Sequence, residues 1–300
     1  MKRLYSNGKL LLTGEYLVLD GAKALALPTK FGQFLDIKPI ESKTIEWKSK
    51  DEKGRAWFED TFTILKEKIS SLHEDAISNR LVQILQVAKQ LNPDFLKTGY
   101  AIESRLTFPR NWGLGSSSTL LNNIADWADI DPYLLLNKTF GGSGYDIACA
   151  RHETAITYQL QNEERLVESI HFNPTFKEDL YFVYLNQKQN SRDGISSYRN
   201  TSDKNEHAIL EINEITNQML VACNSLEHFN GLLKQHEAII SSIIKQPTVK
   251  ARLFPDYEGQ LKSLGAWGGD FILATATKNP ESYFKEKGYH TVIRYQDLIL

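Results

Sequence analysis

The sequence predicts an α+β fold with two domains. Short runs rich in β-branched and aromatic residues predict strands, and two long stretches with apolar residues at every third or fourth position predict helices. These elements intermix without the strict alternation of βαβ units. The chain has 300 residues, 41% of them hydrophobic, which is enough for two domains that each bury a core. We place the boundary near residue 170, so the expected domains are residues 1–169 and 170–300.

The first forty residues are predicted to be β structure. The runs LLLT and YLVL have the composition of strands, and Asp20-Gly21 is a strong signal for a hairpin turn. Two further runs, KALAL ending at Pro28 and then QFLDIKPI, predict more strand.

A helix and a strand follow. Residues 60–92 carry apolar residues at helical spacing until Asn92-Pro93 ends the pattern. Residues 99–108 alternate as a half-buried strand does, and Pro109 closes that strand. The apolar run LLNNIADWA, which follows three serines, predicts another helix.

The second half of the chain has the same mixed character. The runs TAITYQL, DLYFVYLNQ, FILATAT and YHTVIRYQ predict strands. Residues 203–245 predict two consecutive amphipathic helices with an interruption at Asn230-Gly231.

Composition excludes several classes of protein. The formal net charge of −2 provides no basic field for gripping a nucleic acid backbone. The basic start of the chain is broken at once by Thr13, Gly14 and Glu15, and no run reaches the length of a membrane helix, so we expect neither a signal peptide nor a membrane span. Cys149 and Cys223 lie far apart, which fits a reducing cytoplasm. The expected partner is a small-molecule substrate, and a homodimer is left open.

The stretch NWGLGSSSTLLN at residues 111–122 is the strongest functional signal. Glycines allow positive φ angles and close backbone approach, while a helix start offers unpaired N–H groups and the positive end of the helix dipole. Loop amides and the hydroxyls of Ser116, Ser117 and Ser118 would then hold a polyphosphate. A serine N-cap after a flexible turn would give the same letters, so loop chemistry alone leaves both interpretations open.

Familiar nucleotide motifs do not match this stretch. A P-loop needs a lysine after its glycines, and a dinucleotide fingerprint needs glycine at Ser118. Neither HRD nor DFG, the landmarks of protein kinases, occurs in the chain.

Four separated runs resemble the motifs of the GHMP kinases, the family named for galactokinase, homoserine kinase, mevalonate kinase and phosphomevalonate kinase. GKLLLTGEYLVLDGAKALALP at residues 8–28 is similar to the N-terminal motif, and GLGSSS at 113–118 is similar to the ATP-loop motif. GGSGYDIACA at 141–150 resembles the segment with the catalytic aspartate, and LGAWGGDF at 264–271 resembles the third motif. The four runs occur in the family's order and span nearly the whole chain.

The resemblance implies a fold and a reaction. The fold would have an N-terminal ATP-binding domain like domain 2 of ribosomal protein S5, and a C-terminal GHMP kinase domain of ferredoxin-like α+β type. The reaction would transfer the γ-phosphoryl group of ATP, with Mg²⁺, to a small metabolite.

The resemblance also implies roles for individual residues. Asp146 would be the catalytic aspartate and Lys9 the active-site lysine beside it, and Ser117 would hold the metal. The ATP-binding residues would be Gly113, Leu114, Gly115, Ser116, Ser117 and Ser118. The substrate-binding candidates are Glu15, Tyr16, Ser143, Gly144, Arg110 and Arg151, and the third motif contributes Gly265, Gly268 and Gly269.

Each of these roles has an ordinary structural alternative. Asp146 suits a turn or N-cap, Lys9 a surface strand, Glu15 a solvated hairpin and the glycines plain turns. The two arginines suit the surface equally well.

Two features depart from the family pattern. Many members place an acidic magnesium ligand about ten residues before the catalytic aspartate, but residues 132–145 contain no Asp or Glu. Trp267 and Asp270 stand where the third motif has small residues.

The substrate is predicted from the tripeptide Gly14-Glu15-Tyr16. GEY and GSGYD are closer to phosphomevalonate kinases, whereas mevalonate kinases commonly read GEH, so phosphomevalonate is expected first and mevalonate second. An acceptor that already carries phosphate needs two or more cations, and Lys9, Arg110, Arg151 and Arg192 are the candidates. A nucleotide-binding sensor without turnover and an enzyme similar to mevalonate diphosphate decarboxylase stay open as alternatives.

Overall fold

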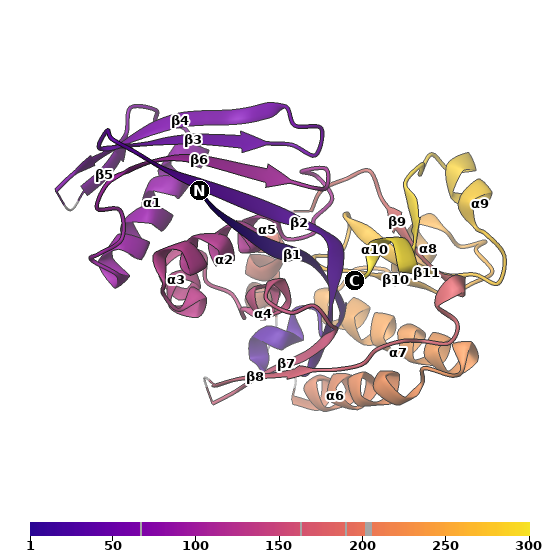
Figure 1. The fold of residues 1–300 in the computed structure, drawn as a ribbon. Helices are drawn as coiled ribbons and strands as arrows, with labels where there is room; N and C mark the ends of the chain where they lie inside the picture. The colour runs from indigo at the N-terminus through magenta and orange to yellow at the C-terminus, as the bar shows by residue number, and fades with distance from the viewer. Residues whose placement is uncertain (67, 163, 190, 202–205) are drawn as a thin grey trace. The chain divides into compact units, whose positions relative to one another are not determined.

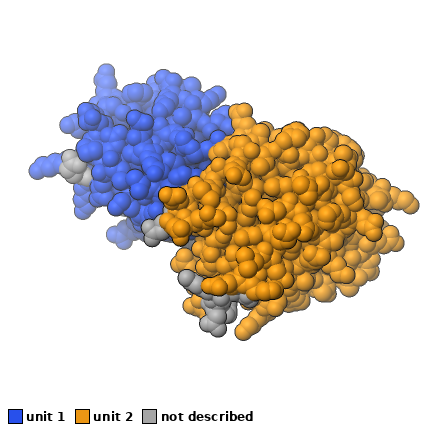
Figure 2. All heavy atoms as spheres, turned by 90° about the horizontal axis from the view of Figure 1, so that it is seen from below, with its two compact units in different colours: residues 1–8, 31–110, 114–151 blue, residues 9–30, 111–113, 152–300 orange. Residues whose placement is uncertain are grey.

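The computed structural model describes residues 1–66, 68–162, 164–189, 191–201 and 206–300, with the side chains of residues 191, 192 and 201 left out (Figure 1). The chain divides into two compact units (Figure 2). Unit 1 consists of Met1–Gly8, Phe31–Arg110 and Leu114–Arg151, and unit 2 of Lys9–Lys30, Asn111–Gly113 and His152–Leu300. Neither unit is a continuous stretch, because the long strands β1 (Lys2–Thr13) and β2 (Ala24–Ile40) contribute residues to both. The grouping therefore differs from the contiguous ranges 1–169 and 170–300.

A twisted sheet forms one side of unit 1. Its strands are β3 (Thr44–Lys50), β4 (Ala56–Leu65), β5 (Lys68–Ser71) and β6 (Gly99–Leu106), joined by the second half of β2. The order is β5-β4-β3-β6-β2, and β1 also pairs with β2. Neighbouring strands in this order are antiparallel except β3 and β6, which are parallel.

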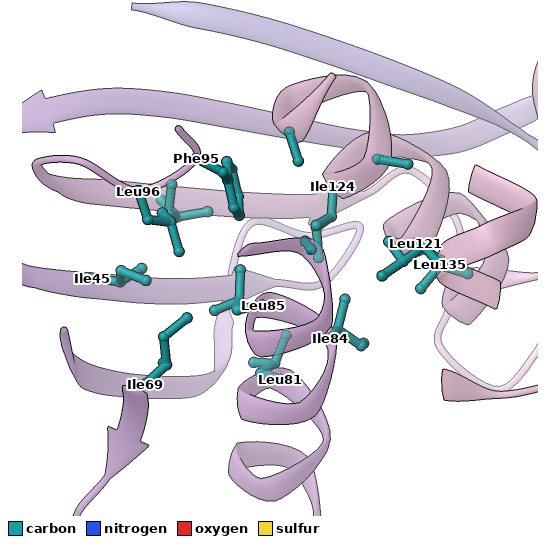
Figure 3. Close-up of a cluster of buried hydrophobic side chains, with 14 of the residues drawn as sticks. Ile45, Ile69, Leu81, Ile84, Leu85, Phe95, Leu96, Leu121, Ile124 and Leu135 are labelled. Carbon is teal, nitrogen blue, oxygen red and sulfur yellow. The ribbon is translucent and has the colours of Figure 1, made fainter. Parts of the chain in front are cut away.

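Helices cover one face of that sheet (Figure 1). They are α1 (Ala76–Leu91), α2 (Ser116–Ala128), α3 (Pro132–Thr139) and α4 (Tyr145–Ala150). Apolar side chains from α1, α2 and α3 meet those of the sheet in a continuous core (Figure 3). Helix α1 begins after Asp75 because that carboxylate accepts the amide hydrogens of Ile77 and Ser78.

Unit 2 contains a second, smaller sheet. Its order is β10-β11-β9-β12, antiparallel throughout. The strands are β9 (Leu180–Tyr184), β10 (Leu261–Ser263), β11 (Phe271–Thr275) and β12 (Val292–Arg294). Strands β7 (Ile156–Gln161) and β8 (Glu164–Ser169) form a hairpin, and β7 pairs with the first residues of β2.

The helices of unit 2 follow the hairpin in sequence, apart from one. The short 3₁₀ helix η1 (Leu17–Asp20) lies between β1 and β2, and η2 (Lys177–Asp179) precedes β9. The others are α5 (Ser191–Thr201), α6 (Glu206–Val221), α7 (Leu226–Ile244), α8 (Val249–Leu253), α9 (Glu281–Glu286) and α10 (Tyr295–Leu298). Helices α6 and α7 pack against each other. Within the ranges that the structure covers, no helix has both the length and the apolar character needed to cross a membrane.

The α+β class and many elements are confirmed. Strands β6, β7, β9 and β11 occupy the predicted runs, and α2 contains the predicted run LLNNIADWA but begins four residues earlier, at Ser116. YHTVIRYQ is strand only at β12, after which α10 begins. No element was predicted over 44–50, where β3 lies.

Three predictions were wrong. YLVL is the helix η1, because Val18 and Leu19 donate to carbonyls of the preceding turn, Gly14 and Tyr16. Residues 60–65 belong to strand β4 and residues 68–71 to strand β5, and the β-branched residues of these strands alternate between buried and exposed positions. The two helices predicted over 203–245 are separated after Val221, and Ser225 caps the second of them, α7. Asn230-Gly231, the predicted break, lies inside α7.

Candidate functional site

The glycine-serine loop ends in a helix start with no side-chain cap. Gly113 and Gly115 have φ of 69° and 89°, and Gly115 is the N-cap of α2 in left-handed conformation. Glycine adopts this backbone readily, whereas an L side chain is strained there. The first N–H groups of a helix have no partner within it, so an uncapped start leaves them for a ligand or for water.

The serines of this loop divide into two kinds. Ser118 Oγ donates to the carbonyl of Gly115 at 2.8 Å and is almost buried. Ser116 and the exposed Ser117, by contrast, make no side-chain hydrogen bond to any residue within the described ranges. Two hydroxyls beside an uncapped 13-residue helix fit an anion such as a phosphate group.

A magnesium ion is the second ligand that this loop could help to hold. Among the described residues, no three His, Cys, Asp or Glu side chains gather as a metal site. Mg²⁺ commonly takes only one or two protein ligands beside substrate phosphates and water. The exposed hydroxyl of Ser117 fits a ligand of that kind.

The predicted catalytic aspartate lies in unit 1 on the first turn of α4. This helix follows Gly144, whose φ is 91°. Asp146 is half-buried, and its Oδ1 accepts the amide hydrogen of Ile147 at 3.0 Å. Ser143, a substrate-binding candidate, is buried just before it. Helix α4 packs against α2 in the same unit, so the structure brings Asp146 and the serine end of the loop into one compact body.

A polar clamp fixes α4 to α2. Arg151, at the C-terminal end of α4, donates from Nη1 to Asn122 Oδ1 at 2.9 Å and to Asp126 Oδ1 at 2.7 Å. Asn122 in turn donates to Ser6 Oγ at 2.9 Å, and Ser6 donates to Asn123. Arg151 therefore has a structural partner, and its predicted contact with substrate stays a prediction.

The other arginine candidate is also engaged. The guanidinium of Arg110 lies 3.5 Å from the centroid of the Trp57 ring, and burial lowers the pKa of Arg110. Its role in substrate binding likewise stays a prediction. The side chain of Arg192 lies outside the described residues.

The predicted active-site lysine lies in unit 2 on β1. Lys9 is half-buried, and its Nζ donates to the carbonyl of Gly113 at 3.3 Å. A Cβ on Gly113 would lie 2.3 Å from Cγ of Asp270, so the carboxylate of Asp270 requires glycine there. Burial raises the pKa of Asp270, and the charge of Lys9 acts in the opposite direction.

The third glycine-rich segment forms a tight turn between β10 and β11. Gly265 and Gly268 have φ of 65° and 91°. A Cβ on Gly269 would lie 2.5 Å from the carbonyl oxygen of Gln187, so this glycine permits a close backbone approach. Asp270 closes the turn by donating its amide hydrogen to Gln187 at 2.6 Å.

Tyr16 connects the N-terminal motif to this turn. Its hydroxyl donates to the carbonyl of Ala266 at 2.9 Å, and its ring stacks on Tyr198. Burial raises the pKa of Tyr16 to about 12, so the hydroxyl stays a donor at neutral pH. With 9% of its surface exposed, Tyr16 faces protein in this unit, and its predicted contact with substrate stays a prediction.

Glu15 belongs to a cluster of four buried ionisable side chains. Glu15, His236 and Lys262 are 0% exposed and Glu237 is 2% exposed. Lys262 Nζ forms an ion pair with Glu15 Oε1 and donates to the carbonyl of Ser263 at 2.8 Å. Glu237 Oε1 accepts the amide hydrogen of Ser263 at 2.8 Å. Glu15 is thus buried against Lys262 of β10, and its predicted contact with the acceptor stays a prediction.

Burial determines the protonation states in this cluster. It raises the pKa of Glu15, which the charge of Lys262 opposes, and it raises the pKa of Glu237 to about 7. Burial and Lys262 together hold the pKa of His236 well below its usual value. The neutral ring accepts the amide hydrogen of Gly14 on Nε2 at 3.0 Å, so its 3.2 Å approach to Glu15 is not an ion pair.

Sequence reasoning did not find Lys262, His236 or Glu237. A signal was present, because His236 and Glu237 occupy positions in the apolar stripe of α7. Lys262 gave no such signal, because its burial in β10 is visible only in the structure. Ionisable residues at core positions indicate a buried polar network.

The fold is similar to that of several solved kinases. A phosphomevalonate kinase from Streptococcus pneumoniae, solved with phosphomevalonate and AMPPNP, is 15% identical with TM-score 0.72, over 98% of this chain and 100% of that one. The mevalonate kinase of Methanococcus jannaschii is 14% identical with TM-score 0.69, over 98% of both chains. Lactococcus lactis galactokinase, complexed with galactose, is 14% identical with TM-score 0.69, over 95% of this chain and 88% of that one.

No family model and no curated protein sequence matches the chain. At these identities the likeness to solved structures establishes the fold, the two-domain α+β fold of GHMP kinases.

The buried cluster predicts a pH dependence of stability. The folded pKa of Glu237, about 7, lies above its usual value of 4.5, so the folded state binds this proton more tightly. The resulting stability is complete below pH 4.5 and is lost as the pH rises through about 7. The free energy of unfolding of the wild type should therefore fall with rising pH by on the order of 3 kcal/mol more than that of Glu237→Gln.

Denaturant unfolding at about pH 5 and about pH 8 measures this difference. Glu227→Gln, at an exposed position of the same helix, is the control and should follow the wild type. Equal pH dependence in Glu237→Gln and the wild type would contradict the assignment.

Proposed function

We propose that the protein is an ATP-dependent small-molecule kinase that transfers the γ-phosphoryl group to an oxygen of a small acidic metabolite. The observation that carries this proposal is the uncapped start of α2, with Gly115 in left-handed conformation and the hydroxyls of Ser116 and Ser117 beside it. The fold supports it, because the similar phosphomevalonate kinase of S. pneumoniae was solved with AMPPNP, an ATP analogue.

The ATP-binding role falls to residues 113–118. Gly113, Leu114 and Gly115 present backbone amides, and Ser116 and Ser117 add hydroxyls. Ser118 contributes its amide hydrogen, since its hydroxyl already donates to Gly115. Together they would neutralise phosphate charge without a lysine in the loop. A magnesium ion held by Ser117, Asp146 and the phosphates would add positive charge to the γ-phosphoryl group.

The transfer step assigns one role to a carboxylate and one to an ammonium group. Asp146 accepts or orients the proton of the acceptor, which is a hydroxyl or a phosphate oxygen that still carries its proton. The acceptor oxygen bonds to the γ-phosphorus as the bond to the bridging oxygen of ADP breaks, and ADP leaves with that electron pair. Lys9 offsets the negative charge that spreads over the transferred group.

The acceptor is proposed to be phosphomevalonate, with mevalonate second. The support is the tripeptide Gly14-Glu15-Tyr16 and the likeness to the enzyme solved with phosphomevalonate. Since Glu15 and Tyr16 are both buried, this tripeptide supports the proposal through sequence likeness rather than through an observed contact surface.

A panel assay tests the function. The protein is incubated with Mg²⁺ and ATP and with mevalonate, phosphomevalonate, diphosphomevalonate, homoserine or simple sugars, while ADP and carbon dioxide are measured together. We expect ADP with one acceptor and no gas. Carbon dioxide with ADP would instead indicate the decarboxylase, and ATP binding without turnover on any acceptor would indicate the sensor.

Asp146→Asn tests the proposed base. The substitution keeps the shape and removes the ability to accept a proton, so kcat should fall by about 10²-fold or more while ATP binding, measured by calorimetry, stays within about threefold. Asp129→Asn, at an exposed carboxylate of the same unit, should behave as the wild type. Near-normal turnover of Asp146→Asn would remove Asp146 from this role.

Gly115→Ala tests the loop. An alanine at φ 89° is strained, and relaxation of the strain moves the amides at the start of α2, so the Kd for AMPPNP should rise by about tenfold. Gly54→Ala is the matched control, because Gly54 also has positive φ, lies in unit 1 and has open space around its Cα. If both variants bind AMPPNP as the wild type does, the loop does not hold the phosphates.

A further inference from the structure

The four buried ionisable residues of unit 2 lie between two predicted functional segments. Glu15 belongs to the turn Gly14–Tyr16 that follows β1, and Lys262 lies in β10, two residues before the glycine-rich segment 264–270. Burying two charges is costly, and a pair of apolar side chains of the same size often stabilises a fold equally well. The ion pair therefore calls for a reason other than stability.

We propose that Glu15 and Lys262 are positioning residues for the phosphoryl-transfer step, which hold β1 and its Lys9 against the glycine-rich segment. This inference rests on the proposed function. Neither side chain is exposed, so each acts through the backbone that it fixes.

Two links join the turn to the glycine-rich segment. Glu15 forms an ion pair with Lys262, two residues before the segment, and the Tyr16 hydroxyl donates to the carbonyl of Ala266 within the segment. The turn is rigid in itself, because Leu17 donates to Glu15 and Val18 donates to Gly14. A displacement of Lys262 would thus be transmitted to the end of β1.

The C-terminal end of the glycine-rich segment, at Asp270, lies near Lys9. Asp270 packs on the backbone of Gly113, to which Lys9 Nζ donates, and the charge of Lys9 acts on the Asp270 carboxylate. Lys9, the turn, Lys262 and Asp270 therefore form a closed series of contacts within one unit. Within this series, the hydrogen bond to Gly113 and the charge of Asp270 hold the ammonium group of Lys9.

The remaining members of the cluster hold the same backbone. His236 of α7 accepts the amide hydrogen of Gly14, and Glu237 of α7 accepts that of Ser263. Helix α7 thus holds the backbone next to both partners of the ion pair, at Gly14 beside Glu15 and at Ser263 beside Lys262. Among the described residues, the titratable side chains that interact with the pair are His236 and Glu237 from α7 and Tyr16, the neighbour of Glu15 in the turn.

A double substitution separates positioning from stability. Lys262→Met alone leaves Glu15 buried without its partner and should destabilise the protein, whereas Glu15→Met/Lys262→Met removes both charges at nearly constant volume and should recover most of that loss. If the pair positions Lys9, the double variant should still have kcat reduced by about tenfold or more, with KM for ATP within about threefold. Leu232→Ala on α7, also buried, is the control for general destabilisation and should retain kcat.

Hydrogen exchange provides a readout that does not depend on activity. In the double variant, amides of residues 14–18 and 264–270 should exchange faster, while those of the hairpin β7–β8 should not change. A folded double variant with wild-type kcat, or with wild-type exchange in both segments, overturns the proposal. If the wild type itself turns over no acceptor, the proposed function fails, and the exchange result alone decides whether the pair holds the two segments together.

Discussion

Left-handed backbone is the constraint on which every segment of the candidate site depends. Gly14, Gly113, Gly115, Gly144, Gly265 and Gly268 all have φ between 65° and 91°. Each precedes or forms a turn that presents amides or a functional side chain, and a Cβ at most such positions would add steric strain. At Gly113 the constraint is doubled, because the carboxylate of Asp270 occupies the place of a Cβ. The positive φ angles of these glycines therefore determine where the amides and side chains of the proposed site lie.

The electrostatic contacts of the molecule differ in what they contribute. The clamp from Arg151 to Asp126 is partly exposed, so water and salt weaken its effect on stability, and its importance lies in the alignment of α4 on α2. The pair of Glu15 and Lys262 is fully buried, where loss of either partner is severe. Removing one partner of an exposed ion pair changes the free energy of unfolding little, whereas removing one partner of a buried pair leaves an uncompensated charge in the core.

The sequence predicted those parts of the site that depend on local chemistry. Glycine followed by serine and an apolar run indicates a helix start, and α2 begins within this pattern, at the first of the serines. The helix expected over 60–92 begins only at Ala76, because the apolar residues at helical spacing lie in its second half, whereas the buried Phe62 and Ile64 of β4 are two apart as in a strand.

Local patterns can indicate that His236 and Glu237 are buried, but they cannot predict which residues these side chains meet. Glu15 and Lys262 are 247 residues apart, and Gly14 and His236 are 222 apart. No spacing rule connects such residues before the fold has formed. Lys262 on its own looks like an ordinary strand lysine, and only its neighbours reveal that it is buried.

The path of β1 and β2 has a consequence for how the chain can be divided. Since both strands cross from one compact unit into the other, each unit is assembled from three separate stretches of polypeptide. No single cut of the polypeptide would therefore release either unit as one continuous fragment, and neither unit can be prepared alone by truncating the chain at one point.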